Sequence, residues 1–523
     1  MLNAECRMMN GGSPIPHSSL STQHSSFSAL DYLLVFFILN LALQPLVEPD
    51  FGWHLRTGLD LLKQGWAMPV TDPYSHTMPD WSWVEHAWLT DGLLGLLYGG
   101  LGSAGPLAVI LLFAAVTLGA FGTAAGLVQA GCTQRLLAVT GALWVSLPFL
   151  GARTQLVTLL GLACLLHLSG LYLAGQWRSL WVLPPFFLLW ANVHGGFTAG
   201  LFVLTLTVAV SVILRLALGR WPSLAATLDE PVLTWKQIGY LTLALAVSVL
   251  VTLLNPYGWR LYSEIYASLN DQFMIEVLHE WQPVSLQTQA GVTYVGYLGL
   301  MGLALALFYR RVEPVRWSLL AFFLVQSLLH WRNVLFFVLL STPLLAELLA
   351  DVTRRIAGLM PDVRRQKQAV LGLTLVLALS MGWLGSDHLQ RVVQCGLAPE
   401  EFFRATEYPI EAVQWVKAHR ERAGTRLYND YGWGGFLLWW LPGEKIFIDG
   451  RMPAWRIGER WIFYDYVALT TWDPPELLVL DKYGVDWAIV GRNSPLDDAL
   501  AQEPGWREVY GDPKATIFVR RKP

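Results

Sequence analysis

The sequence has few charges and few cysteines for its length. Asp, Glu, Lys and Arg make up 14% of the 523 residues and the net charge is −3, which argues against nucleic acid as a partner. The four cysteines, Cys6, Cys132, Cys164 and Cys395, form no Cys-x-x-Cys pair, so neither an internal disulfide nor a cysteine metal site is expected. Because the phosphate loop GxxxxGK[ST], the nucleophile elbow GxSxG and the zinc motif HExxH are missing as well, nucleotide-driven chemistry and zinc proteolysis are not expected.

The sequence is rich in hydrophobic residues and contains many long apolar runs. Hydrophobic residues make up 54%, mean hydropathy is +0.42, and there are 25 tryptophans, a composition typical of a polytopic membrane protein with interfacial aromatics. Residues 88–100 are apolar but short, and are expected to be interfacial or re-entrant. Uncharged runs long enough to approach a ~30 Å hydrocarbon layer predict about eleven spans, at 30–47, 104–130, 136–150, 155–174, 179–193, 196–214, 237–254, 291–309, 317–331, 334–350 and 369–386.

The distribution of Lys and Arg predicts the orientation. With the N-terminus inside, the inner connections carry most of these residues and the outer ones few, which places the N-terminus in the cytoplasm. Residues 1–29, rich in Ser and His, are expected to be a disordered cytoplasmic leader; no apolar core or cleavage site marks a signal peptide. The membrane domain is expected over 30–387, and residues 388–523 are expected to face outward.

Residues 388–523 change to short apolar pieces separated by charges, as in a small α/β domain. Strands are predicted at 425–430, 445–450 and 485–491, helices at 455–469, 475–483 and from Ser494-Pro495, and an edge hairpin from WREVYG and TIFVRR. Asn429, Asp430, Asp449 and Arg451 follow strands, where ligands gather in open α/β sheets. Turn formation explains the same residue types, so both interpretations stay open here.

The first outer loop, 48–85, and the residues just beyond it concentrate polar side chains on the outward side. Residues 53–66 have the pattern of a helix lying in the interface, which would hold Asp50 beside the lipid headgroups. A carboxylate there can act as a general base or bind a divalent cation, or it can simply cap the following helix. The polar residues of this region are Glu48, Asp50, Trp53, His54, Arg56, Asp72, His76, Glu85 and His86.

Later outer connections also place polar groups just past apolar runs. Arginine suits a phosphate or pyrophosphate group because it binds two oxygens at once, although interfacial anchoring or capping explains any one position. Arg153, His194 and Arg332 are therefore expected to converge with Asp50 around one outward cavity. The residues in these connections are Arg153, Asn192, His194, Asn255, His330, Arg332 and Asn333.

The motifs together resemble a known family. An acidic motif after the first span, a surface helix behind it, about eleven spans and an outward C-terminal domain are similar to the GT-C glycosyltransferases, including protein mannosyltransferases and lipid A aminoarabinose transferases. The resemblance is strongest to a largely uncharacterised bacterial membrane group and covers almost the whole chain after residue 29. Its motifs stand at Asp50 to Leu55, Thr71 to Ser75, Trp83 to Leu89, Trp190 to Gly196, Asn255 to Gly258, Asn429 to Gly435 and Asp449 to Arg451.

The resemblance implies a GT-C-like fold in the bacterial inner membrane, a polyprenyl-phosphate sugar donor, a periplasmic acceptor (glycan, lipid or protein) and Asp50 as the catalytic residue. Glu48-Pro49-Asp50 replaces the adjacent carboxylates of many relatives, so a requirement for Mg²⁺ or Mn²⁺ at Glu48 and Asp50 stays open. Ala87 stands where a carboxylate is expected, near Glu85. The residues expected to bind substrate are Trp53, His54, Arg56, Asp72, Glu85, His86, Arg153, Asn192, His194 and Arg332.

Two other classes of function compete with this one. A non-catalytic scaffold of envelope assembly would use its outer domain to bind a partner and would tolerate Asp50→Asn. A transporter would need ionisable groups at mid-membrane depth, and His167 is nearly alone there.

Overall fold

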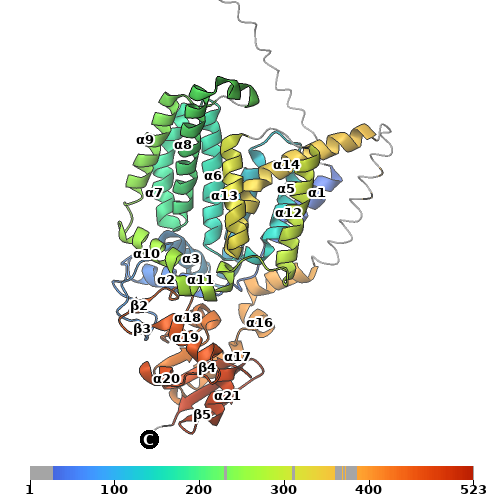
Figure 1. The fold of residues 1–523 in the computed structure, drawn as a ribbon. Helices are drawn as coiled ribbons and strands as arrows, with labels where there is room; N and C mark the ends of the chain where they lie inside the picture. Colours follow the sequence, from blue (N-terminus) through green and yellow to red (C-terminus); the bar gives the residue numbers. More distant parts are fainter. Residues whose placement is uncertain are drawn as a thin grey trace, which may run out of the picture.

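The computed structural model describes residues 28–228, 232–308, 313–359 and 386–521, together with positions 368 and 372. The span expected at 369–386 and the leader expected over 1–29 therefore fall almost entirely outside the described residues. A helical bundle forms one part of the molecule, and the C-terminal α/β region lies beyond one end of it (Figure 1). The α-helices of the bundle are α1 (Ala29–Ala42), α4 (Gly105–Gly126), α5 (Cys132–Ser146), α6 (Gln155–Leu173), α7 (Leu183–Val193), α8 (Phe197–Arg220), α9 (Trp235–Val251), α12 (Gln289–Phe308), α13 (Pro314–Leu329) and α14 (Val334–Leu359).

The chain is a multi-pass membrane protein, but the expected number of about eleven spans is not confirmed. Three apolar helices are too short to be counted as candidate spans: Ala29–Ala42, Trp235–Val251 and Pro314–Leu329. At 1.5 Å per residue, the 14 residues of α1 extend only about 21 Å, less than the ~30 Å hydrocarbon layer. Within the described residues, five helical segments are long and apolar enough to cross a membrane: Gly102–Gly126, Gln155–Leu173, Phe197–Arg220, Gln289–Leu307 and Trp331–Leu359.

A layer of short helices separates the bundle from the C-terminal region (Figure 1). It contains α2 (Phe51–Lys63), α3 (Trp88–Gly100), α10 (Arg260–Asn270) and α11 (Gln272–Val277). The segment 88–100, expected to be interfacial or re-entrant, is α3. Helices α2 and α3 approach closely because Gly58 and Gly95 face each other, and a Cβ atom on either would overlap the other helix's backbone. Short 3₁₀ turns connect the elements: η1 (Gly102–Ala104), η2 (Leu147–Phe149), η3 (Trp177–Val182), η4 (Pro222–Thr227), η5 (His279–Trp281), η6 (Trp331–Asn333), η7 (Arg420–Arg422) and η8 (Tyr431–Trp433).

The C-terminal region has the expected α/β architecture. Its four-stranded sheet has the order β1-β4-β6-β5, with β1 and β4 parallel and the other pairs antiparallel. The strands are β1 (Leu427–Asn429), β4 (Trp487–Gly491), β5 (Trp506–Gly511) and β6 (Ala515–Arg520), with β2 (Arg456–Ile457) and β3 (Arg460–Trp461) as a separate pair. The helices are α16 (Pro399–Arg404), α17 (Ile410–Ala418), α18 (Gly434–Trp440), α19 (Ile462–Thr471), α20 (Leu478–Lys482) and α21 (Pro495–Gln502).

Two of the elements predicted for the C-terminal region differ from those in the structure. Residues 445–450 do not form a sheet strand, because their backbone pairs with the first outer loop: the Ile446 N–H donates to the Tyr74 carbonyl, and the Ile446 carbonyl accepts from the His76 N–H. The predicted helix 455–469 begins instead as the hairpin β2–β3, since Gly458 has φ +57 and turns the chain. Only its second half is helical, in α19.

Candidate active site

Asp50 lies at the point where the chain leaves α1 and enters α2. It occupies the N-cap position of α2, yet its side chain makes no capping hydrogen bond, so the capping interpretation does not account for it. The Trp53 indole N–H donates to Asp50 Oδ1 over 3.0 Å instead. Burial raises the pKa of Asp50, against the opposing effects of Trp53 and His54. Among the described residues, no hydrogen-bond partner contacts the other carboxylate oxygen, and the raised pKa favours uptake of a proton.

Beside Asp50, the C-terminal domain packs against the acidic motif through the main-chain atoms of glycine residues. A Cβ atom on Gly450 would overlap Asp50 Oδ1, and one on Gly435 would overlap the Pro49 carbonyl. From the other side, a Cβ atom on Gly52 would overlap the Gly435 carbonyl. Glycine is required here because two segments from distant parts of the chain meet through main-chain atoms. The acidic motif and the tail motif are thus two halves of one site.

Arg451 fastens this part of the C-terminal domain to the first outer loop. Its guanidinium pairs with Asp449 at 2.7 Å and with Asp72 at 2.8 Å, and only 5% of its side chain is exposed. The Asp72 carboxylate also accepts from the backbone N–H and hydroxyl of Ser75. Asp72, predicted to bind substrate, therefore has its oxygens engaged within the protein, where they order the loop.

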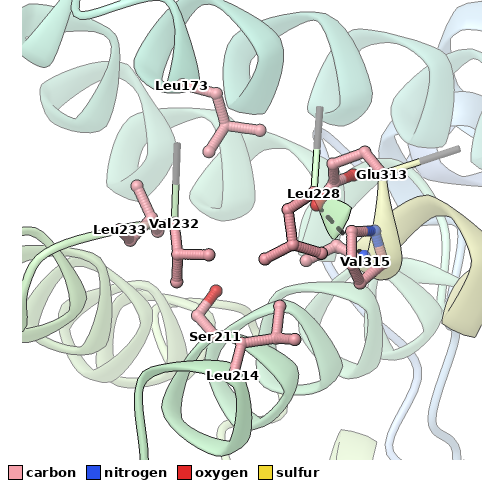
Figure 2. Close-up of a pocket in the computed structure, with 9 residues that line it drawn as sticks. Leu173, Ser211, Leu214, Leu228, Val232, Leu233, Glu313 and Val315 are labelled. Atoms are coloured by element: carbon pink, nitrogen blue, oxygen red, sulfur yellow. Dashed lines mark hydrogen bonds between the residues drawn. The ribbon is translucent and has the colours of Figure 1, made fainter. Parts of the chain in front are cut away.

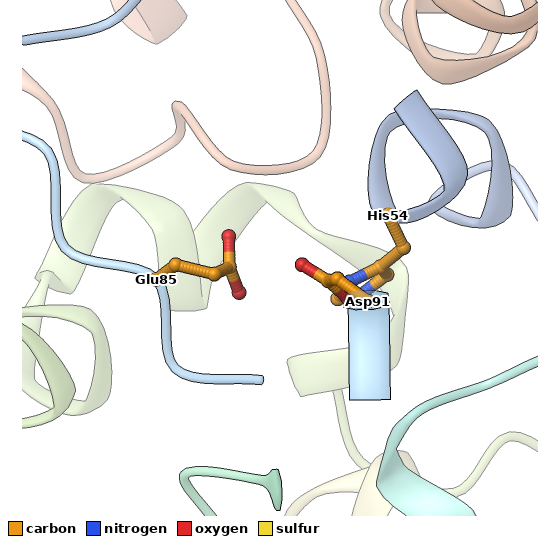
Figure 3. A group of neighbouring side chains, drawn as sticks. All are labelled: His54, Glu85 and Asp91. Atoms are coloured by element: carbon orange, nitrogen blue, oxygen red, sulfur yellow. The ribbon is translucent and has the colours of Figure 1, made fainter. Parts of the chain in front are cut away.

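His54 joins α2 to α3. Its Nδ1 lies 2.6 Å from Asp91 Oδ1, and its Nε2 lies 3.2 Å from the Thr154 hydroxyl. The Glu85 carboxylate points toward this pair from the loop (Figure 3). Burial lowers the pKa of His54 and raises that of Asp91, and it raises the pKa of Glu85 to about 8. One imidazole and two carboxylates thus lie together, away from solvent.

Two further histidines continue from this group. The His86 ring lies 6.0 Å from His54 and 5.4 Å from His194 between ring centres. His194 Nδ1 accepts from Gly196 N–H at 3.0 Å and contacts the Thr158 hydroxyl at 2.7 Å. Burial lowers the pKa of His86 to about 3 and that of His194 as well. Both rings are therefore neutral near pH 7 and suit hydrogen bonding better than charge pairing.

The two predicted phosphate arginines are each paired with an acid. Arg153 pairs with Glu48, and Arg332 pairs with Glu280 at 3.1 Å and lies 4.3 Å above the Trp281 ring. Glu48 is largely buried, and burial raises its pKa to about 7, against the field of Arg153. The field of Arg153 reaches Glu48, and the field of Arg332 reaches His86 and His194. Both cations thus lie at the Asp50 end of the bundle.

No protein-family model matches the chain, and no curated protein matches its sequence. Among solved structures, ArnT from Cupriavidus metallidurans, bound to undecaprenyl phosphate, is similar over 94% of this chain and 97% of its own, with a TM-score of 0.50 and 13% identity. The chain has a GT-C fold. The oligosaccharyltransferase of Archaeoglobus fulgidus, tethered to an acceptor peptide with the NVT sequon, is similar over 88% of this chain and 69% of its own, with a TM-score of 0.48 and 10% identity.

Within this GT-C fold, two predicted site residues have structural partners. Arg56 pairs with Asp60 on its own helix at 2.8 Å. The Asn192 side-chain amide donates to the Leu188 and Leu254 carbonyls and accepts from the Trp88 indole N–H. Each of the two is therefore expected to act on a substrate only indirectly, by positioning the neighbours to which it is bound.

Sequence reasoning missed Asp91 as a member of the site. Asp91 is the single charged residue in the apolar run 88–100, and this isolated charge was the signal in the sequence that could have indicated its place in the site. It also missed that Tyr431 stands close enough to Asp50 and Asp449 for their charges to raise its pKa further, after burial.

A pocket far from these residues does not belong to the site. It has a volume of about 50 Å³ and lies among α6, α8 and the start of α13, with Leu173, Ser211, Leu214 and Glu313 in its wall (Figure 2). That volume suits a few water molecules and is small for a sugar.

Proposed function

We propose that the protein is a membrane glycosyltransferase that moves a sugar from a polyprenyl-phosphate donor to an acceptor on the side of the C-terminal domain. The proposal rests on Asp50, a half-buried carboxylate at the end of the bundle that does not cap α2. Main-chain atoms of the C-terminal domain lie on one side of it, and arginines lie nearby. The likeness to ArnT, a protein solved with undecaprenyl phosphate, supports the lipid donor. We further propose the bacterial inner membrane as its location, with the C-terminal domain in the periplasm.

In the proposed reaction Asp50 acts as the general base. The acceptor oxygen or nitrogen attacks the anomeric carbon, its proton passes to the free Asp50 oxygen, and the bond from that carbon to the phosphate oxygen breaks. The lipid phosphate leaves with its electron pair, and Arg153 and Arg332 balance the charge. A raised pKa suits a base, because the protonation state changes closer to working pH.

Glu48 and Asp50 do not fit together as a metal-binding pair. The Glu48 carboxylate is bound by Arg153, and a cation would have to displace that guanidinium. The proposed reaction therefore uses no metal at this position.

Sugar transfer in liposomes tests the proposal. Radiolabelled polyprenyl-phosphate sugars are offered to the wild type, to Asp50→Asn and to Asp80→Asn, an exposed acid of the same loop that pairs with Arg460. Asparagine keeps the acceptor for Trp53 but cannot take the proton, so we expect a loss of ~100-fold or more, with Asp80→Asn unchanged.

Transfer that survives Asp50→Asn in folded protein would refute Asp50 as the base. If no donor turns over in the wild type and Asp50→Asn leaves cellular function intact, the scaffold function would replace the enzyme.

A further inference from the structure

The first outer loop meets the C-terminal domain along a short row of hydrogen bonds around His76. The backbone N–H of His76 donates to the Ile446 carbonyl, and the backbone N–H of Ile446 donates to the Tyr74 carbonyl. Next to them, the Thr77 hydroxyl donates to the Phe447 carbonyl at 2.7 Å. We name this set of contacts the loop seam. It joins two segments that lie about as far apart in the chain as the two halves of the candidate site.

The His76 side chain takes part in the loop seam in one protonation state. Its Nε2 lies 2.7 Å from the Leu427 carbonyl in β1. Because a carbonyl oxygen only accepts, Nε2 carries the proton of the neutral ring and Nδ1 carries none. Nδ1 is buried and has no hydrogen-bond partner among the described residues. A second proton would have to sit on Nδ1, where a charged group would be buried with no acceptor for its N–H.

The charged groups around His76 also oppose a second proton. Burial lowers the pKa of His76, and the hydrogen bond to the Leu427 carbonyl acts against this effect. The fields of Arg426 and Lys445 lower the pKa further, and the field of Asp486 raises it. The Asp486 carboxylate is already bound to backbone, since it accepts from the N–H of Arg426 at 2.7 Å. A protonated His76 would therefore face two cations.

The segment that His76 holds leads directly to Asp50. Gly450 follows Ile446 by four residues, and a Cβ atom on Gly450 would overlap Asp50 Oδ1. Asn429 in β1 holds the same segment from the sheet, because its side chain accepts from the Phe447 N–H at 2.8 Å. The place of Gly450 beside Asp50 thus depends on contacts made on both sides of the segment, and the loop seam is one of these sides.

We propose that His76 is a positioning residue that closes the loop seam in its neutral form and loosens it on taking up a proton. In the open state the ring meets water and has an ordinary pKa of ~6.5, so the open state binds the proton more readily than the closed one. The closed state is therefore favoured above that pH and loses stability as the pH falls below it, by up to ~10-fold in the equilibrium per pH unit. The inference concerns how the two halves of the candidate site stay together, and it stands whether or not the proposed transfer is correct.

Hydrogen exchange of the full-length protein in detergent tests the proposal. The backbone amides of His76 and Ile446 both donate across the loop seam, so peptides that contain them report its opening. Peptides from β4 and β6, which pair with each other in the sheet, are the internal control. At pH ~5.5 compared with ~7.5, after correction for the intrinsic effect of pH on exchange, we expect ~10-fold faster exchange at the seam amides and no change in the sheet.

Two variants separate His76 from other groups that titrate. His76→Gln keeps an N–H for the Leu427 carbonyl but cannot take up the proton, so the seam amides should exchange equally at the two pH values. His419→Gln is the matched control, because His419 contacts the Trp415 carbonyl in the same stretch of chain and lies outside the loop seam. It should respond as the wild type does.

Two results would overturn the proposal: equal corrected exchange of the seam amides at both pH values in the wild type, or a wild-type response retained in His76→Gln. If His76→Gln does not fold, Lys445→Gln takes its place. Loss of this exposed cation makes protonation of the closed state less unfavourable, so the response at pH ~5.5 should shrink; an undiminished response there would also overturn the proposal. None of these readouts requires turnover, so failure here is distinct from failure of the glycosyltransferase proposal.

Discussion

Arg451 shows what one side chain contributes when it is fully enclosed. Two carboxylates bind its guanidinium, and the rings of Trp53, Tyr74, Trp83 and Trp455 surround it at 5.2–5.8 Å. The flat guanidinium fits between aromatic faces and offers several N–H groups in fixed directions, which the ammonium of lysine does not.

Replacing Arg451 by Ala should therefore destabilise the protein strongly. The change leaves two buried acids without their cation, a loss of ~3–5 kcal/mol for breaking a buried pair. Arg404→Ala, which removes a half-exposed cation paired with Glu400, should cost at most ~1 kcal/mol. Unfolding in detergent followed by tryptophan fluorescence measures both. Equal melting temperatures for the two variants would contradict a structural role for the Arg451 cage.

Single residues were predicted unevenly from the sequence, for a physical reason. Asp50, His54 and Glu85 stand in a polar loop, where chemistry is visible in residue types. The meeting of Arg451 with Asp72 joins positions 379 apart, and no local pattern records such a contact. The site-residue assignments themselves stay predictions until the variants are measured.

At the scale of elements, the packing of α2 against α18 decides whether the site forms. The two helices come from opposite ends of the chain and touch through Gly52 and Gly435. The hydrophobic pattern predicted α2 and strands β1, β4, β5 and β6 because burial of one face has a period. It misassigned residues 445–450, since an apolar run records that a segment is buried and not which backbone pairs with it.

Gly52→Ala should separate α2 from α18. The added methyl group meets the Gly435 carbonyl, so one backbone must move, at a cost of ~1–3 kcal/mol or more. Gly122→Ala in α4, where nothing lies within 4 Å of the new atom, should be neutral or stabilise by up to ~1 kcal/mol. Melting temperature and transfer activity report both. Normal activity in a folded Gly52→Ala variant would show that the backbone contact is not needed.

For the whole molecule, the two ends of the bundle have different characters. Thr133, next to Cys132, donates to Asp31 in the first turn of α1, whereas the last turn of α1 leads to Asp50. Cys132 therefore lies at the end opposite the site. The expected orientation places this end in the cytoplasm and the C-terminal domain outside.

Labelling of right-side-out vesicles with a membrane-impermeant maleimide tests this orientation. Cys132 is exposed and should react only after permeabilisation, whereas a cysteine introduced by Glu421→Cys, an exposed position of the C-terminal domain, should react at once. Cys132→Ser should abolish the permeabilisation-dependent signal, apart from any contribution of Cys6. The reverse order of labelling would invert the predicted topology.

The fold of the whole chain also changes how truncation is to be interpreted. Gly450 and Gly435 pack against the acidic motif. Removal of residues 388–523 would therefore abolish function whether the protein is an enzyme or a scaffold. Only the Asp50 variant separates these two functions.

Because of the same contact, a newly made molecule lacks a complete candidate site until residues 434–451 have been added. The acidic loop is made early in synthesis, and residues 434–451 follow some 20–80 s later at ~5–20 residues per second. Until then Asp50 stands uncovered. If any helix between them inserts in the wrong direction, the two halves are delivered to opposite sides of the membrane and never meet. The activity proposed for Asp50 thus requires a chain in which both halves of the candidate site reach the same side of the membrane.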